Sequence, residues 1–138
     1  MFEIYRYTDS DQSLWDDFVP NANNGTLFHL RSFLSYHSPD RFVDHSLLVN
    51  KKGKIFSVFP AAEQEIDGNR YLVSHPGSSV GSFVVNENLS IADSIDLVKS
   101  LILYSKRLKF DGIRITMPPN LYQRRLSNYM DFSFMKNN

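Results

Sequence analysis

The chain has 138 residues, with 15 basic and 15 acidic side chains and no cysteine. This length suits one domain with a real hydrophobic core and is short for two domains. A formal net charge of zero provides no overall field for recruiting nucleic acid or an anionic membrane surface. The lack of cysteine excludes disulfides, thiolate catalysis and cysteine-ligated zinc.

The beginning of the chain predicts a strand followed by a short helix. Residues 2–7 alternate apolar and polar side chains, as a half-buried strand does. Ser10 and Asp11 are N-cap candidates for a helix that Pro20 helps to end. The sequence shows neither the apolar run of a secretory signal nor the roughly 18 apolar residues of a membrane span. We therefore expect a cytoplasmic protein without a membrane partner.

Residues 26–37 predict a second helix, because apolar side chains recur three or four residues apart. Residues 43–74 then predict three consecutive antiparallel strands that are joined by two tight turns. Lys52-Gly53 and Asp67-Gly68 are the two hairpin turn signals.

Residues 90–109 form the clearest predicted helix, with Ser90 as the N-cap and Asp93 three residues later in a capping-box arrangement. Its predicted buried stripe consists of Ile91, Ile95, Val98, Ile102 and Leu108. A strand over 113–119 and a short helix within 120–129 follow. The last segment alternates again, which predicts a final strand with Phe132 and Phe134 on one face.

The loop "SHPGSS" follows the third hairpin strand and is the main candidate for a functional site. Glycine permits close backbone approach and serine offers short hydrogen bonds, so a substrate loop, a phosphate cradle and a plain chain reversal all remain open. Histidine and arginine on the second helix are candidates to line the same cleft. The predicted substrate-binding residues are His29, Arg31, Ser74, His75, Ser78 and Ser79. We identify no catalytic residue, and the four histidines show no metal-ligand spacing.

The order of these elements resembles the GNAT acyltransferase superfamily. The segments "NGTLFHLRSFLSYH", "FPAAEQEIDGNRYLVSHPGSSVGSFVV" and "SNYMDFSFMKN" look like the N-terminal half of FemAB-like proteins, which are double-GNAT acyltransferases. The resemblance covers nearly the whole chain. It implies an α/β GNAT-like fold, with a mixed, mainly antiparallel central sheet flanked by helices. It also implies that residues 1–138 are a single GNAT-like domain, the N-terminal half of a longer two-repeat protein.

The resemblance implies an N-acyltransferase in which this chain is the acceptor-side half. An acyl group would pass from acyl-CoA, acetyl-CoA in the simplest case, or alternatively from aminoacyl-tRNA, to an amine such as an amino sugar or a peptidoglycan or cell-surface precursor. Acyl-CoA-binding GNAT domains carry a [QR]-x-x-G-x-[GA] motif before their third helix, and this sequence has Gly77 and Gly81 there without that spacing. We therefore expect this chain alone to bind no cofactor.

The expected partners are a small-molecule acceptor and a second GNAT-like half, or a second copy of the chain in self-association through the exposed C-terminal strand. The alternative is a non-catalytic GNAT-like binding or assembly domain. The missing cofactor motif is what favours that alternative.

Overall fold

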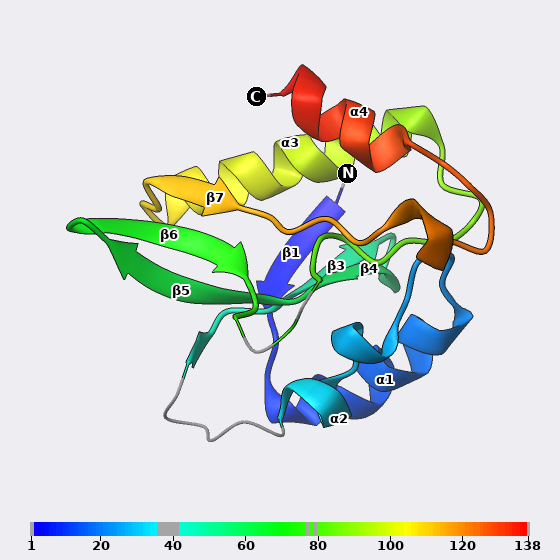
Figure 1. The fold of residues 1–138 in the computed structure, drawn as a ribbon, viewed down its shortest axis with the longest axis horizontal. Helices are drawn as coiled ribbons and strands as arrows, with labels where there is room; N and C mark the ends of the chain where they lie inside the picture. The colour runs from blue at the N-terminus through cyan, green and yellow to red at the C-terminus, as the bar shows by residue number, and fades with distance from the viewer. Residues whose placement is uncertain (1, 36–41, 77, 79, 138) are drawn as a thin grey trace.

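The computed structural model describes residues 2–35, 42–76, 78 and 80–137, and places the strands between two layers of helices (Figure 1). Helices α3 and α4 lie side by side on one face, and α1 and α2 lie on the other. Within the described residues, no helix combines the length and apolar character needed to cross a bilayer.

The α-helices are α1 (Gln12–Asn21), α2 (Arg31–Leu34), α3 (Ile91–Arg107) and α4 (Tyr129–Lys136). The strands are β1 (Phe2–Arg6), β2 (Val43–Asp44), β3 (Leu47–Lys51), β4 (Lys54–Phe59), β5 (Ala61–Ile66), β6 (Asn69–Ser74) and β7 (Gly112–Arg114). Short 3-10 helices are Asp9–Asp11, Leu27–His29 and Asn120–Tyr122.

The strands form two sheets. β1, β3 and β4 make a three-stranded antiparallel sheet, and β2, β5, β6 and β7 make a four-stranded sheet in which β7 runs parallel to β6. The chain changes sheets at Pro60, between β4 and β5. Because proline has no backbone N–H to donate, it interrupts a ladder at this point. Residues 43–74 contain no helix, as predicted, but they form the strands β2 to β6 instead of three strands.

Both hairpin turns occur where the sequence predicts them. Lys52 and Gly53 join β3 to β4 with φ angles of 52° and 76°. Asp67 and Gly68 join β5 to β6 with φ angles of 52° and 81°. Positive φ at both central residues is typical of the type I′ turn, whose twist matches that of the strands it connects.

β3 separates two hydrophobic clusters, because successive strand side chains point to opposite faces. Leu48 packs with Trp15 and Val19 of α1 in the smaller cluster. Leu47 and Val49 belong to the larger cluster, to which α3 and α4 contribute. The three-stranded sheet that contains β3 is therefore covered by helices on both faces, in agreement with the two layers of helices in Figure 1.

Helix α3 begins as predicted, since the Ser90 Oγ accepts a hydrogen bond from the Asp93 N–H at 3.0 Å. The Asp93 carboxylate binds Lys51 Nζ at 3.0 Å, an ion pair that the predicted capping box did not include. The predicted buried stripe is wrong at Ile91, which is exposed. The buried face consists of Ser94, Leu97, Val98, Leu101, Tyr104 and Ser105. Serines occupy it because each hydroxyl bonds within the helix or to a neighbour, so hydrophobicity alone does not reveal this face.

The end of the chain is helix α4, and the predicted final strand is wrong. Met130, Ser133 and Phe134 lie three and four residues apart, so a helix places them on one face toward α3 and the core. The Ser133 and Ser94 hydroxyls are 2.8 Å apart and hydrogen-bonded. Phe132, which a strand would place beside Phe134, is 49% exposed. The open strand edge predicted there is consequently absent from the described residues.

The second predicted helix is shorter than expected within the described residues. The 3-10 turn is followed by Leu30 in an extended conformation, with φ −72° and ψ 138°. Helix α2 then has only four residues, Arg31–Leu34. This break directs the side chains of His29 and Arg31 into the interior, where both are buried. Residues 36–41, the rest of the predicted helix and the loop after it, lie outside the described residues.

Candidate functional site

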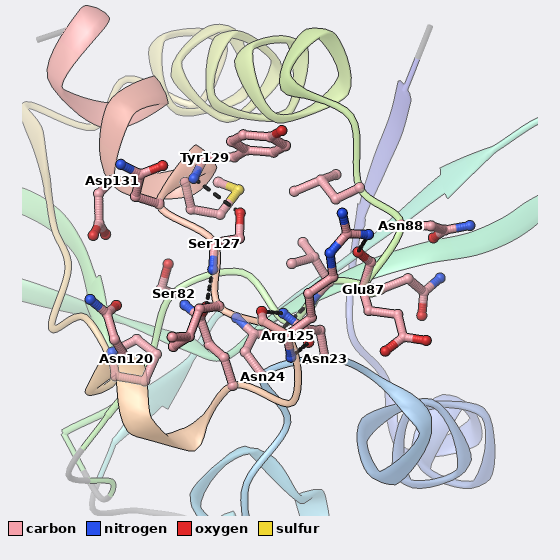
Figure 2. Close-up of a pocket in the computed structure, with 18 of the residues that line it drawn as sticks. Asn23, Asn24, Ser82, Glu87, Asn88, Asn120, Arg125, Ser127, Tyr129 and Asp131 are labelled. Carbon is pink, nitrogen blue, oxygen red and sulfur yellow. Dashed lines mark hydrogen bonds between the residues drawn. The ribbon is translucent and has the colours of Figure 1, made fainter.

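A cavity of about 560 Å³ lies at the N-terminal end of α3 (Figure 2). One wall is formed by residues 85–91, which lead into α3, and another by parts of residues 117–131, which connect β7 to α4. Asn23 and Asn24, which follow α1, and Ser82 complete the lining. Segments far apart in the sequence thus meet around one concave site, the usual form of a small-molecule binding site.

Asn23 and Asn24 hold two of these segments together. The Asn24 side chain donates to the Phe83 carbonyl and accepts from the Val85 N–H, both at 2.8 Å. The Asn23 side chain donates to the Arg125 carbonyl at 2.9 Å and accepts from its N–H at 2.6 Å. Each of these buried side-chain amides therefore donates one hydrogen bond to the main chain and accepts one from it, as the backbone of a neighbouring strand would. These two residues build the cavity wall and have little capacity left for a ligand.

Most other polar residues of the cavity lie at its rim. Asn86, Glu87, Asn88, Asn120 and Asn128 are exposed. Asp131 is half-buried and comes from the first turn of α4, and Tyr129 of the same helix also borders the cavity (Figure 2). The rim therefore consists largely of amide and carboxylate groups with one aromatic face.

The charge of the lining is slightly negative. Glu87 and Asp131 contribute two carboxylates, and Arg125 contributes the one cationic side chain among the lining residues. Arg125 Nη1 lies 3.5 Å from the Glu87 carbonyl oxygen. An amide-rich lining with excess carboxylate suits a neutral polyhydroxylated ligand or a cationic amine, because amides pair with hydroxyls and carboxylates attract ammonium groups.

His29, a predicted substrate-binding residue, lies in the interior. Its Nε2 is 3.0 Å from the Gly81 carbonyl oxygen, which can only accept, so this nitrogen carries the proton. Its Nδ1 accepts from the Thr26 N–H at 3.1 Å. Burial lowers the pKa of His29, although the bond to Gly81 opposes this effect. His29 is thus a neutral residue that anchors the chain just before Ser82.

Arg31 and His75 lie together in a junction cluster, defined as Arg31, Asp44, Ser46 and His75, between the two sheets. Arg31 Nη1 binds the Asp44 carboxylate at 3.1 Å and Ser46 Oγ at 2.8 Å. His75 Nε2 is 3.5 Å from the same carboxylate. Burial raises the pKa of Asp44, but the hydrogen bond with His75 and the charge of Arg31 outweigh it and lower the value to about 2.

The serines of the predicted loop bond to main chain. Ser74 Oγ accepts from the Thr116 N–H at 2.7 Å. Ser78 Oγ donates to the Phe28 carbonyl at 3.0 Å or to the Val80 carbonyl at 2.9 Å. Ser79 lies outside the described residues. None of the five described candidates lines the cavity of Figure 2.

A second polar cluster joins β5 to α3. Glu63 binds the Arg70 guanidinium and lies 3.4 Å from His45 Nδ1, while His45 Nε2 is 2.8 Å from the Tyr104 hydroxyl. Burial lowers the pKa of His45, and the nearby Arg6 charge acts in the same direction. Among the described residues, no group of three or more histidine, aspartate or glutamate side chains is placed to hold a metal ion.

The residues that line the cavity were missed by the sequence analysis. A signal exists in the asparagines of "NANN" at 21–24 and "NEN" at 86–88, because each cluster sits in a loop beside a helix end. Such clusters are also common in ordinary turns. Only the packing of the two loops against residues 117–131 makes them parts of one site.

No protein-family model and no curated protein matches this chain. Solved structures do resemble it. A GNAT family acetyltransferase from Staphylococcus aureus superposes with a TM-score of 0.52 and 16% identity, over 86% of this chain and 88% of that one. The chain has a GNAT fold. An aminoglycoside acetyltransferase from an uncultured soil sample, in complex with sisomicin, superposes on this chain with a TM-score of 0.55 and 9% identity, over 99% of this chain and 86% of that one.

A transcriptional regulator from Bacillus halodurans also shares the fold, with a TM-score of 0.61 and 11% identity over 100% of this chain and 93% of that one. Identities this low establish the fold and leave the activity open. The predicted GNAT-like fold class is therefore confirmed. The narrower FemAB-like resemblance stays a prediction.

Proposed function

We propose that this GNAT domain binds an amine-bearing sugar in the cavity at the N-terminal end of α3, and acts as the acceptor-binding part of an N-acyltransferase. The side chains that line the cavity are the main support for the proposal. Its amides suit the hydroxyls of a sugar, Glu87 and Asp131 attract an ammonium group, and Tyr129 offers an apolar face for a sugar ring.

Two structural neighbours support this class of acceptor. One is the aminoglycoside acetyltransferase in complex with sisomicin, and another is an aminoglycoside 6'-N-acetyltransferase from Acinetobacter haemolyticus. Aminoglycosides consist of amino sugars, which also occur in peptidoglycan and other cell-surface precursors. An amino sugar is therefore the acceptor that we propose for this chain.

The acyl-CoA donor that the fold implies does not fit the residues at this cavity. A pyrophosphate needs several free N–H donors or cations, as a glycine-rich loop before a helix supplies. Here Gly81 does not line the cavity, and its N–H already donates to the Thr116 carbonyl at 2.8 Å. The lining residues carry two carboxylates and one guanidinium, a balance that repels a pyrophosphate. We propose that a second GNAT-like half holds the donor, and that this domain contributes by fixing the acceptor.

The alternative function is a non-catalytic sugar-binding module with the same cavity. The same carboxylates and amides would then recognise a saccharide without any transfer. Binding of acetyl-CoA by the complete protein distinguishes the two, because only the enzyme needs a donor.

The cavity is tested by following the backbone N–H signals of the 15N-labelled chain by NMR during titration with D-glucosamine. We expect shifts of the N–H signals of Asn88, Ser90 and Asp131, because these residues line the cavity. Glucose has no amine and is the matched control, so its shifts should be weaker. The same titration with acetyl-CoA should leave Ser90 unchanged.

Two outcomes would contradict the proposal. Glucosamine that moves none of the cavity signals would remove the acceptor site. Acetyl-CoA binding with micromolar affinity and a shift at Ser90 would make the cavity a donor site and this chain a self-sufficient acyl-CoA-binding domain.

We propose that the second half packs on the exposed apolar side chains that follow β7 in the chain. They are Met117, Leu121, Tyr122, Leu126, Tyr129, Phe132 and Met135. Exposed apolar side chains gathered on one segment favour association. Sedimentation equilibrium of the chain alone should show self-association at micromolar concentration, and Leu126→Gln with Met135→Gln should abolish it. A wild-type chain that stays monomeric would contradict this proposal.

A further inference from the structure

Ser82 combines a strained backbone with a buried hydroxyl that has no hydrogen-bond partner among the described residues, and it borders the cavity. The residue is 1% exposed, and its Oγ makes no hydrogen bond to any described residue. Its φ of 73° lies in the left-handed region, which residues other than glycine rarely adopt. Ser82 is one of the cavity-lining residues labelled in Figure 2.

Ser82 is distinguished by its position from the other buried polar atoms without a hydrogen bond among the described residues. Those atoms are Arg31 Nε, His45 Nδ1 and Asn50 Oδ1. Their residues do not line this cavity. Leaving a buried hydroxyl unpaired is unfavourable, so a group that fills the cavity is the natural partner for Ser82.

The backbone on both sides of Ser82 is held in place. The Gly81 carbonyl accepts from His29, and the Gly81 N–H donates to Thr116. The Phe83 carbonyl accepts from Asn24. A left-handed serine persists only where its surroundings enforce it, and such enforced strain is concentrated at ligand-binding positions.

We infer that Ser82 hydrogen-bonds the sugar at the inner wall of the cavity and is a specificity-determining residue for its hydroxyl groups. The inference rests on the proposed function, since it names a contact to the proposed ligand. A serine hydroxyl donates one hydrogen bond and accepts two, so it can pair with a sugar hydroxyl in either direction. Asn23 and Asn24 already use their amides on main chain, which leaves this role to Ser82.

The test compares Ser82→Ala, Ser82→Gly and Ser57→Ala. Alanine removes the hydroxyl and keeps the left-handed strain, whereas glycine removes both. Ser57 is a buried serine on β4 whose hydroxyl is satisfied, because its Oγ donates to the Val84 carbonyl at 2.7 Å. It is therefore the matched control for loss of a buried hydroxyl.

We expect both Ser82 variants to bind D-glucosamine roughly 3- to 10-fold more weakly than wild type, the loss that one hydrogen bond produces. Ser82→Gly should unfold at a higher urea concentration than Ser82→Ala, because it relieves the strain. Ser57→Ala should unfold at a lower urea concentration and keep wild-type affinity.

Each outcome decides a different point. Wild-type affinity in both Ser82 variants would overturn the role of Ser82 and leave the proposed function standing. A wild-type chain that does not bind glucosamine would overturn both. If Ser82→Ala fails to fold, Ser82→Gly alone tests the affinity. Weaker binding in Ser57→Ala as well would show that the effect belongs to buried serines in general, and would also overturn the inference.

Discussion

The junction cluster and the cavity use similar polar side chains in opposite ways. In the junction cluster, the Arg31 guanidinium and the Asp44 carboxylate bind one another and share Ser46. At the cavity, the exposed amides of Asn88 and Asn120 surround a space of about 560 Å³. Polar groups that satisfy one another hold elements together, whereas polar groups that converge on an open volume are available to a ligand.

The predicted substrate residues belong to the first kind. His29, Arg31 and His75 are buried and bound to other parts of the chain. Buried charges survive only when they are paired, and truncating one partner leaves the other uncompensated. The two regions should therefore respond differently to mutation: the junction cluster through stability, and the cavity through affinity.

The largest effect is expected from Asp44→Ala, which leaves the buried Arg31 guanidinium without its carboxylate. We expect the free energy of unfolding to fall by about 3 kcal/mol, the loss typical of a broken buried pair. Urea denaturation followed by circular dichroism measures it. Glu65→Ala, which removes an exposed carboxylate from β5, should change stability by less than about 0.5 kcal/mol. Equal losses in the two variants would contradict the distinction between the regions.

Acid should destabilise the fold in two steps. Burial lowers the pKa of His29 and His45 below the ordinary value of 6.5, so the unfolded chain takes up these protons first. Stability is fully present above pH 6.5 and is lost as the pH falls below it. A second loss, of about 2 kcal/mol, should follow between pH 4 and pH 2, because the Asp44 pKa of about 2 lies below its unfolded value.

Urea midpoints recorded from pH 8 to pH 2 show both steps. Asp44→Asn should reduce the lower step and retain the upper one. Burial raises the pKa of Glu63, but Arg70 and His45 outweigh it and lower this pKa too, so protonation of Glu63 contributes to the same step. A midpoint that stays constant from pH 7 to pH 5 would contradict the lowered histidine pKa values.

A smaller loss, of about 1 to 2 kcal/mol, is expected from Gly81→Ala. A Cβ at this position would lie 2.6 Å from Ser74 Oγ and 2.8 Å from Ser74 Cβ. Moving Ser74 away would break its bond with the Thr116 N–H. Because Gly81 precedes Ser82, this variant should also weaken glucosamine binding in the NMR titration. Wild-type stability would show that Gly81 and Ser74 are less tightly packed than the structure has them.

The smallest change in stability is expected from Asp131→Asn at the cavity rim. Its free energy of unfolding should stay within about 0.5 kcal/mol of wild type. Binding of D-glucosamine should weaken several-fold, while binding of uncharged glucose should not, because only the ammonium group loses an opposite charge. Added salt should reduce the difference between wild type and variant. Equal effects on the two sugars would contradict an electrostatic role for this carboxylate.

Local sequence patterns determined much of the fold. The Lys52-Gly53 and Asp67-Gly68 turns and the start of α3 at Ser90 depend on the residues present at those positions, because turn and cap preferences act over only a few residues. The GNAT-like fold class was predicted from the order of the strands and helices together with the resemblance of three segments to FemAB-like proteins. The same local reasoning failed at the end of the chain, since "MDFSFMK" fits a strand by alternation and a helix by the spacing of Met130, Ser133 and Phe134.

Only the tertiary structure decided which polar residues form a site. Packing against α3 selected the helix at the end of the chain, because Ser133 and Phe134 have partners there. The same packing brought residues 85–91, Asn23, Asn24 and parts of 117–131 around one cavity. Whether a side chain such as His29 or Ser82 has a partner depends on groups many positions away in the chain. The sequence shows that these residues are polar, and three-dimensional proximity alone shows which hydrogen bonds remain open.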